Sequence, residues 1–195
     1  QKALLRSQAL SLTGKYNLSN SGFGLVAGVR QLTIKRSTLN INPAQGDLVT
    51  TPDSGIGYVA GVSYEMPEIA LKVLLTQAPG IDIVVPTTVV GSGTVSQPSF
   101  TTLEFETGIA NNTLLFGSIH QGEHASAQVK LNGIGAISSF TDGEKYNIGV
   151  GRKFSEKLSG SFSYTTEEGS SATGTSLLSP TNGTDTDSIG VNYVS

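Results

Sequence analysis

The sequence contains no cysteine and no tryptophan, and only 14% of its 195 residues are charged. Without cysteine the chain has neither a disulfide framework nor a thiolate metal site. Its formal net charge is -3, so it lacks the basic surface that binds nucleic acid. No apolar run approaches the roughly 18 residues of a membrane-spanning helix. These absences exclude a disulfide-stabilised module, a zinc–thiolate protein and a helical membrane protein.

The first twelve residues, QKALLRSQALSL, also lack the continuous apolar segment of a secretory signal. Arg6, Ser7 and Gln8 interrupt it. We therefore expect a mature, processed or truncated chain.

What the sequence does contain is alternation of apolar with small or polar residues. In YVAGVSYEMPEIALKVLLT, Tyr58 to Thr76, the two kinds alternate on both sides of a corner at Met66 to Glu68. A period of two predicts a β-hairpin. The pattern recurs along the chain, giving about nine strands of roughly ten residues, the length typical of membrane barrel strands. No segment is convincingly helical. We predict an all-β, antiparallel fold in the form of a transmembrane β-barrel.

The connections between the predicted strands alternate in length. Short connections fall at 17–22, 66–68, 110–113 and 154–157, and long ones at 36–55, 78–99, 122–143 and 167–187. A soluble sandwich has no reason to sort its loops in this way, because both of its ends face water. An outer-membrane barrel has short periplasmic turns and long external loops. We expect parts of the long loops, Ile83 to Val90 and Ala127 to Ile137, to extend the strands beyond the bilayer.

The two faces of the strands then have separate environments. We expect the apolar face to contact lipid and the Gly- and Ser-rich face to line a lumen. The polar candidates for the lumen are Lys15, Arg30, Glu65, Lys72, Glu104 and Glu106. The lipid-facing candidates are Tyr58, Val62, Tyr64, Leu71, Val73, Leu103, Phe105, Ile148, Val150, Phe162, Tyr164, Val191 and Tyr193. Aromatic residues that include Phe100 and Phe116 are candidates for girdles at the membrane interfaces. The alternation leaves open a soluble β-sandwich that buries the same apolar face against a second sheet.

Three segments carry a resemblance to a known family: GYVAGVSYEMPEIALKVLLT, TLEFETGIANNTLLFGSI and YNIGVGRKFSEKLSGSFSY. In this order they resemble the C-terminal portion of FadL/TodX outer-membrane transport proteins, especially alphaproteobacterial members. The resemblance implies the outer membrane of a Gram-negative bacterium as the location. It implies membrane lipid and hydrophobic small molecules such as fatty acids as partners, and passive uptake of these molecules without enzymatic activity.

Family members have a fourteen-stranded barrel plugged by an N-terminal hatch. Residues 1–195 are expected to form a single barrel domain or a portion of one, with no hatch evident. If the short turns are periplasmic, an odd number of strands is absent upstream, and five would restore fourteen. The alternative is a reduced barrel of eight to ten strands that closes on itself. No functional residue of the family carries over to a position in this chain.

The sequence offers no convincing catalytic, cofactor or metal site. His120 and His124 are four residues apart, but they lie where a strand enters a loop, which favours solvated histidines over metal ligands. Glu104 and Glu106 share a strand face, and a wet lumen explains them better than paired catalytic acids do. We predict no enzyme and no cofactor. Two other functions stay open: a small structural or receptor barrel whose external loops bind a partner, and a soluble β-sandwich adhesin or virion component.

Overall fold

The computed structural model describes residues 2–4, 6–19, 21–42, 46–88, 90–138, 140–168 and 184–193. These residues form antiparallel strands in three sheets. The helices among them are two short 3-10 turns, η1 (Pro67–Ile69) and η2 (His124–Ser126). Within the same residues, no helix has the length and hydropathy that crossing a membrane requires. The prediction of an all-β, antiparallel fold is confirmed.

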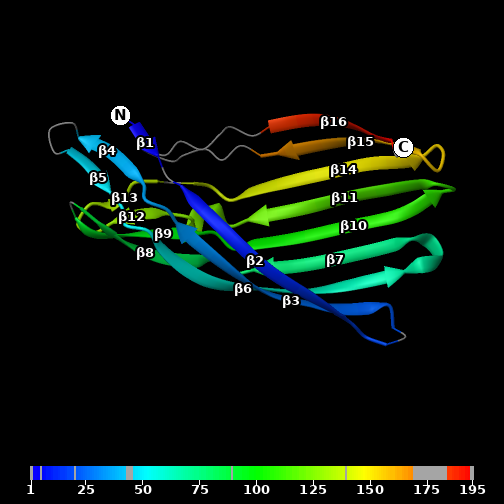
Figure 1. The fold of residues 1–195 in the computed structure, drawn as a ribbon, viewed down its shortest axis with the longest axis horizontal. Helices are drawn as coiled ribbons and strands as arrows, with labels where there is room; N and C mark the ends of the chain where they lie inside the picture. The colour runs from blue at the N-terminus through cyan, green and yellow to red at the C-terminus, as the bar shows by residue number, and fades with distance from the viewer. Residues whose placement is uncertain are drawn as a thin grey trace.

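The largest sheet has nine strands in the order β16-β15-β14-β11-β10-β7-β6-β3-β2 (Figure 1). The strands are β2 (Ser7–Asn17), β3 (Phe23–Ile34), β6 (Asp53–Met66), β7 (Leu71–Ala78), β10 (Phe100–Ala110), β11 (Thr113–Gly122), β14 (Gly143–Lys153), β15 (Leu158–Glu167) and β16 (Thr184–Tyr193). Each strand pairs with its predecessor in this meander, which confirms the nine predicted strands. Within the described residues, β2 and β16 are paired on one side only.

Four tight turns join these strands at one end of the sheet, which we call the short-turn end. Three of them have a left-handed residue: Gly22 at φ 71°, Ala70 at φ 50° and Asn112 at φ 58°. The hairpin strand predicted from Ile69 begins instead at Leu71. Pro67 starts a 3-10 turn there, and the Ala70 amide donates a hydrogen bond to the Pro67 carbonyl at 3.1 Å.

At the opposite end, strand β1 and the described parts of three long connections form two small sheets (Figure 1). One contains β1 (Lys2–Leu4), β4 (Thr38–Asn42) and β5 (Gly46–Val49), and the other β8 (Ile81–Thr87), β9 (Gly91–Gln97), β12 (Val129–Leu131) and β13 (Gly135–Ala136). The expectation that 83–90 and 127–137 extend the main strands is wrong. Pro79 and Gly80 end β7, and β8 then pairs with β9 along its whole length.

The buried core lies between these connections and the main sheet. Its members are Leu32, Ile34, Leu48, Ile81, Ile83, Val85, Val95, Val129, Leu131 and Ile137. Ile81 and Ile83 pack on β6 at two glycines: a Cβ atom on Gly55 would lie 2.6 Å from Ile81, and one on Gly57 2.7 Å from it. Leu32 pairs with Gly55 in register and shares its face. We call the sheet of β8, β9, β12 and β13 the cap, because it covers this face of β3 and β6.

The other face of the nine-stranded sheet is apolar and uncovered. Its side chains that are 49–80% exposed include Leu10, Leu12, Leu25, Val29, Ile56, Tyr58, Val62, Ile148, Phe162 and Ile189. Soluble monomers rarely expose contiguous apolar patches larger than a few hundred Å². Within the described residues no second sheet packs on this face, so the interleaved core of a β-sandwich is not formed.

Candidate functional site

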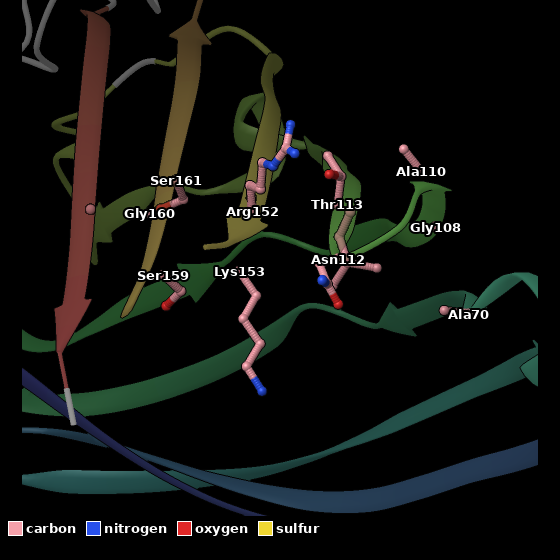
Figure 2. Close-up of a pocket in the computed structure, with 13 residues that line it drawn as sticks. Ala70, Gly108, Ala110, Asn112, Thr113, Arg152, Lys153, Ser159, Gly160 and Ser161 are labelled. Carbon is pink, nitrogen blue, oxygen red and sulfur yellow. The ribbon is translucent and has the colours of Figure 1, made fainter. Parts of the chain in front are cut away.

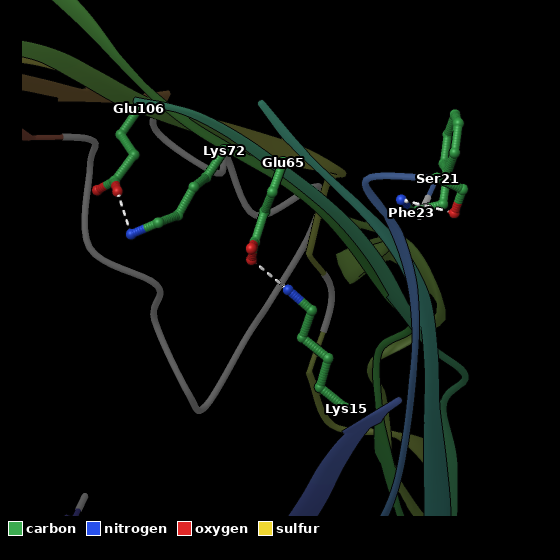
Figure 3. A network of polar contacts seen from close by, with 6 residues as sticks. All are labelled: Lys15, Ser21, Phe23, Glu65, Lys72 and Glu106. Atoms are coloured by element: carbon green, nitrogen blue, oxygen red, sulfur yellow. Dashed lines mark hydrogen bonds and ion pairs between the residues drawn. The ribbon is translucent and has the colours of Figure 1, made fainter. Parts of the chain in front are cut away.

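Five of the six polar residues predicted to line a lumen gather in one cavity. Lys15, Glu65, Lys72, Glu104 and Glu106 line a space of about 620 Å³. Figure 3 shows the strands curving round four of these side chains, so we call this face of the sheet concave and the apolar face convex. The sixth residue, Arg30, lies nearer the cap, where its guanidinium nitrogen is 2.7 Å from the side-chain amide of Gln97.

Two ion pairs cross the cavity wall (Figure 3). Lys15 pairs with Glu65, and Lys72 Nζ lies 2.6 Å from Glu106 Oε1. Glu65, Lys72 and Glu106 are direct neighbours on β6, β7 and β10, so opposite charges alternate from strand to strand. All four side chains are at least one-third exposed. The pairs therefore mainly cancel charge within the cavity and contribute little to stability.

Lys15 reaches Glu65 across an intervening strand, because β3 lies between β2 and β6. The residue beneath its side chain is Gly24. A Cβ atom on Gly24 would lie 2.8 Å from Lys15 Cε and 2.6 Å from Ser63 Oγ. Real Cβ atoms essentially never show such short contacts. Because Gly24 has no side chain, the Lys15 side chain can pass over it to reach Glu65.

A row of register partners crosses the cavity beside the ion pairs. It runs through Ser63, Leu74, Glu104, Ser118 and Asn147 on five adjacent strands. Asn147 Nδ2 continues it with a hydrogen bond of 2.7 Å to Thr165 Oγ1. Sequence reasoning missed Ser63 and the row, because an isolated strand shows its faces but not which residues meet across strands.

The cavity also has apolar side chains in its wall, which include Val26, Leu74 and Phe116. Phe116 lies over Gly149, where a Cβ atom would come 2.5 Å from the Phe116 ring. Phe116 and Phe100 are therefore not girdle residues. Phe116 lines the concave cavity, and Phe100, on the same face of β10 as Glu104, stacks on His120 with ring centroids 5.0 Å apart. Both faces of β11 carry large apolar residues, so alternation alone could not orient it.

A second cavity of about 610 Å³ continues the concave face to the short-turn end (Figure 2). Small residues dominate its wall: Ala70, Gly108, Ala110, Gly151, Ser159, Gly160, Ser161 and Gly190. Lys153 and Arg152 also border it, and Figure 2 shows their side chains pointing in opposite directions. Leu114 lines this cavity and Phe116 the first, and the two share one face of β11.

The histidines lie at the end of the sheet that bears the cap. His124 meets Phe100 edge-on, with ring centroids 5.8 Å apart, and His120 Nδ1 lies 2.8 Å from Thr102 Oγ1. Across the part of the chain that the structure describes, no three His, Asp or Glu side chains are grouped to hold a metal ion.

The residues predicted to face lipid share the convex face wherever their side chains are described. Six are exposed: Tyr58, Val62, Ile148, Val150, Phe162 and Tyr164. Five are half-buried: Tyr64, Leu71, Val73, Leu103 and Phe105. Phe105 lies over Gly117, and Tyr64 packs against Phe23 with ring centroids 4.8 Å apart. Val191 and Tyr193 lie on β16 opposite Gly160 and Leu158, and their side chains fall outside the described part.

Comparison with known proteins gives a structural likeness. No protein-family model matches the sequence, and no curated protein matches it. Among solved structures, the chain is similar to a crystal structure of a Pseudomonas aeruginosa FadL homologue, with a TM-score of 0.60 and 11% sequence identity. The alignment covers 84% of this chain and 50% of that chain. This chain therefore spans about half the length of the Pseudomonas protein and shares the fold of the aligned part.

Proposed function

We propose that this chain forms the wall of an outer-membrane β-barrel that lets hydrophobic molecules, fatty acids among them, cross passively. One observation carries the proposal: a single curved sheet has an exposed apolar convex face and a polar concave face hollowed by two cavities. A lipid environment removes the free-energy cost of exposing the apolar face to water. The likeness to a FadL homologue supports the same reading of the fold.

Closure of the sheet into a barrel is part of the proposal. In hydrocarbon each unpaired backbone amide or carbonyl costs several kcal/mol, so a membrane sheet has no tolerable free edge. The outward edges of β2 and β16 therefore need strand partners. Closure into fourteen strands, as in the FadL/TodX family, or into a smaller barrel would both provide them.

The transport step needs no chemistry from the protein. Transfer of an apolar molecule out of water yields about 25 cal/mol per Å² of buried apolar surface. In this proposal such a molecule passes along the concave face between the cap and the short turns, where the two cavities lie. On this account the side chains of the route orient and select the molecule, and the chain is not an enzyme.

The external loops suggest a second candidate function, that of a receptor barrel. The described parts of three long connections form paired strands that share a buried core with β3 of the main sheet. A rigid loop surface of this kind suits binding of a macromolecular partner.

Uptake into vesicles separates the two functions. Vesicles containing the protein should take up neutral fluorescent hydrocarbons and fluorescent fatty acids faster than empty vesicles, and saturably. Absence of saturable uptake for every member of such a panel would exclude transport and leave the receptor.

A further inference from the structure

The larger cavity contains one negative charge without a counter-charge. Its lining includes two lysines and three glutamates. Lys15 and Lys72 pair with Glu65 and Glu106. Glu104 has no ion pair or hydrogen bond with any residue that the structure describes, and its side chain is exposed to the cavity. A ligand that enters this space therefore meets a neutralised wall with a single carboxylate available.

A second polar group in the same row also lacks a partner. Ser63 is only 6% exposed, and its hydroxyl oxygen makes no hydrogen bond within the described residues. Buried polar atoms are nearly always hydrogen-bonded, so such an orphan in a cavity wall points to a ligand or solvent atom. Ser63 and Glu104 flank Leu74 on β6, β7 and β10. Strands lie about 4.8 Å apart, which places the two backbones about 10 Å from each other.

An apolar track leads from this polar row to the second cavity. Phe116 lies beside Glu106 in register, and Leu114 follows it on the same face of β11. Beyond Leu114 the wall consists mainly of glycine, alanine and serine, which leave room for a chain of methylene groups. The concave face thus offers a polar site at one end and a narrow apolar path at the other.

We propose that this site selects a linear amphiphile with an ammonium-containing head group. The ammonium donates hydrogen bonds to Glu104, a second polar atom of the head group bonds to Ser63, and the alkyl chain lies along Phe116 and Leu114. An alkyl carboxylate would place a like charge beside Glu104, so it binds more weakly. The inference rests on the proposed function and narrows it from hydrophobic compounds in general to one head-group class.

Three probes of equal chain length test the head group: dodecylamine, dodecanol and dodecanoate. Each radiolabelled probe is dialysed at pH 7 against the protein in phosphatidylcholine nanodiscs, with empty nanodiscs as the blank. At this pH the amine is charged, since alkyl ammonium groups of the lysine type titrate near 10.4. We expect dodecylamine to bind about tenfold more tightly than dodecanol, which corresponds to about 1.4 kcal/mol. Dodecanoate should bind most weakly.

Substitutions of single residues test which side chains cause the preference for dodecylamine. Glu104→Gln should remove the preference for dodecylamine, whereas Glu68→Gln, with the same charge change on the η1 turn outside the cavity, should keep it. Ser63→Ala should weaken 2-(dodecylamino)ethanol about threefold, and an unchanged affinity would exclude Ser63 from the site. Heat-modifiable gel migration checks that each variant is folded. If Glu104→Gln does not fold, the preference of the unmodified protein for dodecylamine over dodecanol and dodecanoate tests the head-group assignment.

The outcomes separate this inference from the proposed function. Equal affinities for the three probes, tighter binding of dodecanoate than of dodecylamine, or an undiminished preference in folded Glu104→Gln would overturn the head-group assignment and leave transport standing. If no probe binds saturably, the head-group assignment fails, and the vesicle uptake panel decides the transport function separately.

Discussion

A substitution on β15 distinguishes a lipid-facing sheet from a water-facing one. Phe162 lies in the middle of β15 on the convex face, between Val150 and Ile189, and is 49% exposed. In water, arginine at such a half-exposed position would cost little beyond the lost apolar contacts. On the lipid face of a barrel, arginine near the bilayer midplane costs about 2–4 kcal/mol. Phe162→Arg therefore tests the environment of the convex face directly.

The matched control is the preceding residue. Ser161 faces the cavity at the short-turn end, where arginine would have room and access to water. A cost of about 2–4 kcal/mol for Phe162→Arg lowers the ratio of folded to unfolded protein by about thirtyfold to nearly a thousandfold. Ser161→Arg should change it less than about tenfold. Guanidinium titration in phosphatidylcholine vesicles, followed by heat-modifiable migration, measures both. Equal costs for the two variants would refute the assignment of the convex face to lipid.

Three further predictions follow from the fold. Leu71→Arg should cost only about 0–1 kcal/mol in the same titration. Leu71 begins β7 beside the short turn, and this position corresponds to the membrane interface rather than the midplane. A cost of about 2–4 kcal/mol would show that the bilayer lies at a different height on the sheet. Ile83→Ala should destabilise the cap by about 2–5 kcal/mol and speed proteolysis of the long connections. Val84→Ala, at a 58% exposed position, should do neither. Similar cleavage rates for the two variants would contradict the buried position of Ile83. Gly24→Val should displace the Lys15 side chain and open the large cavity, and the Lys15 amine should then be acetylated faster. An unchanged acetylation rate would show that the Lys15 side chain does not pass over Gly24.

The number of main strands followed from the sequence, and so did the two faces of the strands other than β11, because one contrast between apolar and small or polar residues governs them. Tyr58, Val62 and Phe162 alternate with Gly61, Ser63 and Ser161, and a one-residue shift would exchange the two environments. Three of the short turns were equally predictable in place, since proline or asparagine marks them, whereas the turn at 154–157 contains neither residue. Their details were not, because the 3-10 geometry at Pro67 depends on how β6 and β7 pair.

The cap and the charged cavity escaped prediction because they arise from contacts between distant segments. The run from Ile81 to Val85 has the pattern of a continuing strand, and only its pairing with β9 and its seat on Gly55 and Gly57 make it a separate sheet. Lys15 and Glu65 are 50 residues apart in sequence. Glu104 looks the same as Glu106 within one strand, and only the neighbouring strand shows that one carboxylate is paired and the other is not.

Depth-dependent fluorescence quenching tests the central claim most directly. The chain has no tryptophan of its own, so tryptophans introduced one at a time at positions 161 to 164 of β15 can be compared in vesicles of brominated phosphatidylcholine. A convex face in contact with lipid predicts strong quenching at 162 and 164 and weak quenching at 161 and 163. Quenching that is equally weak at all four positions, in protein shown to be folded, would mean that the apolar face of this sheet does not touch the acyl chains.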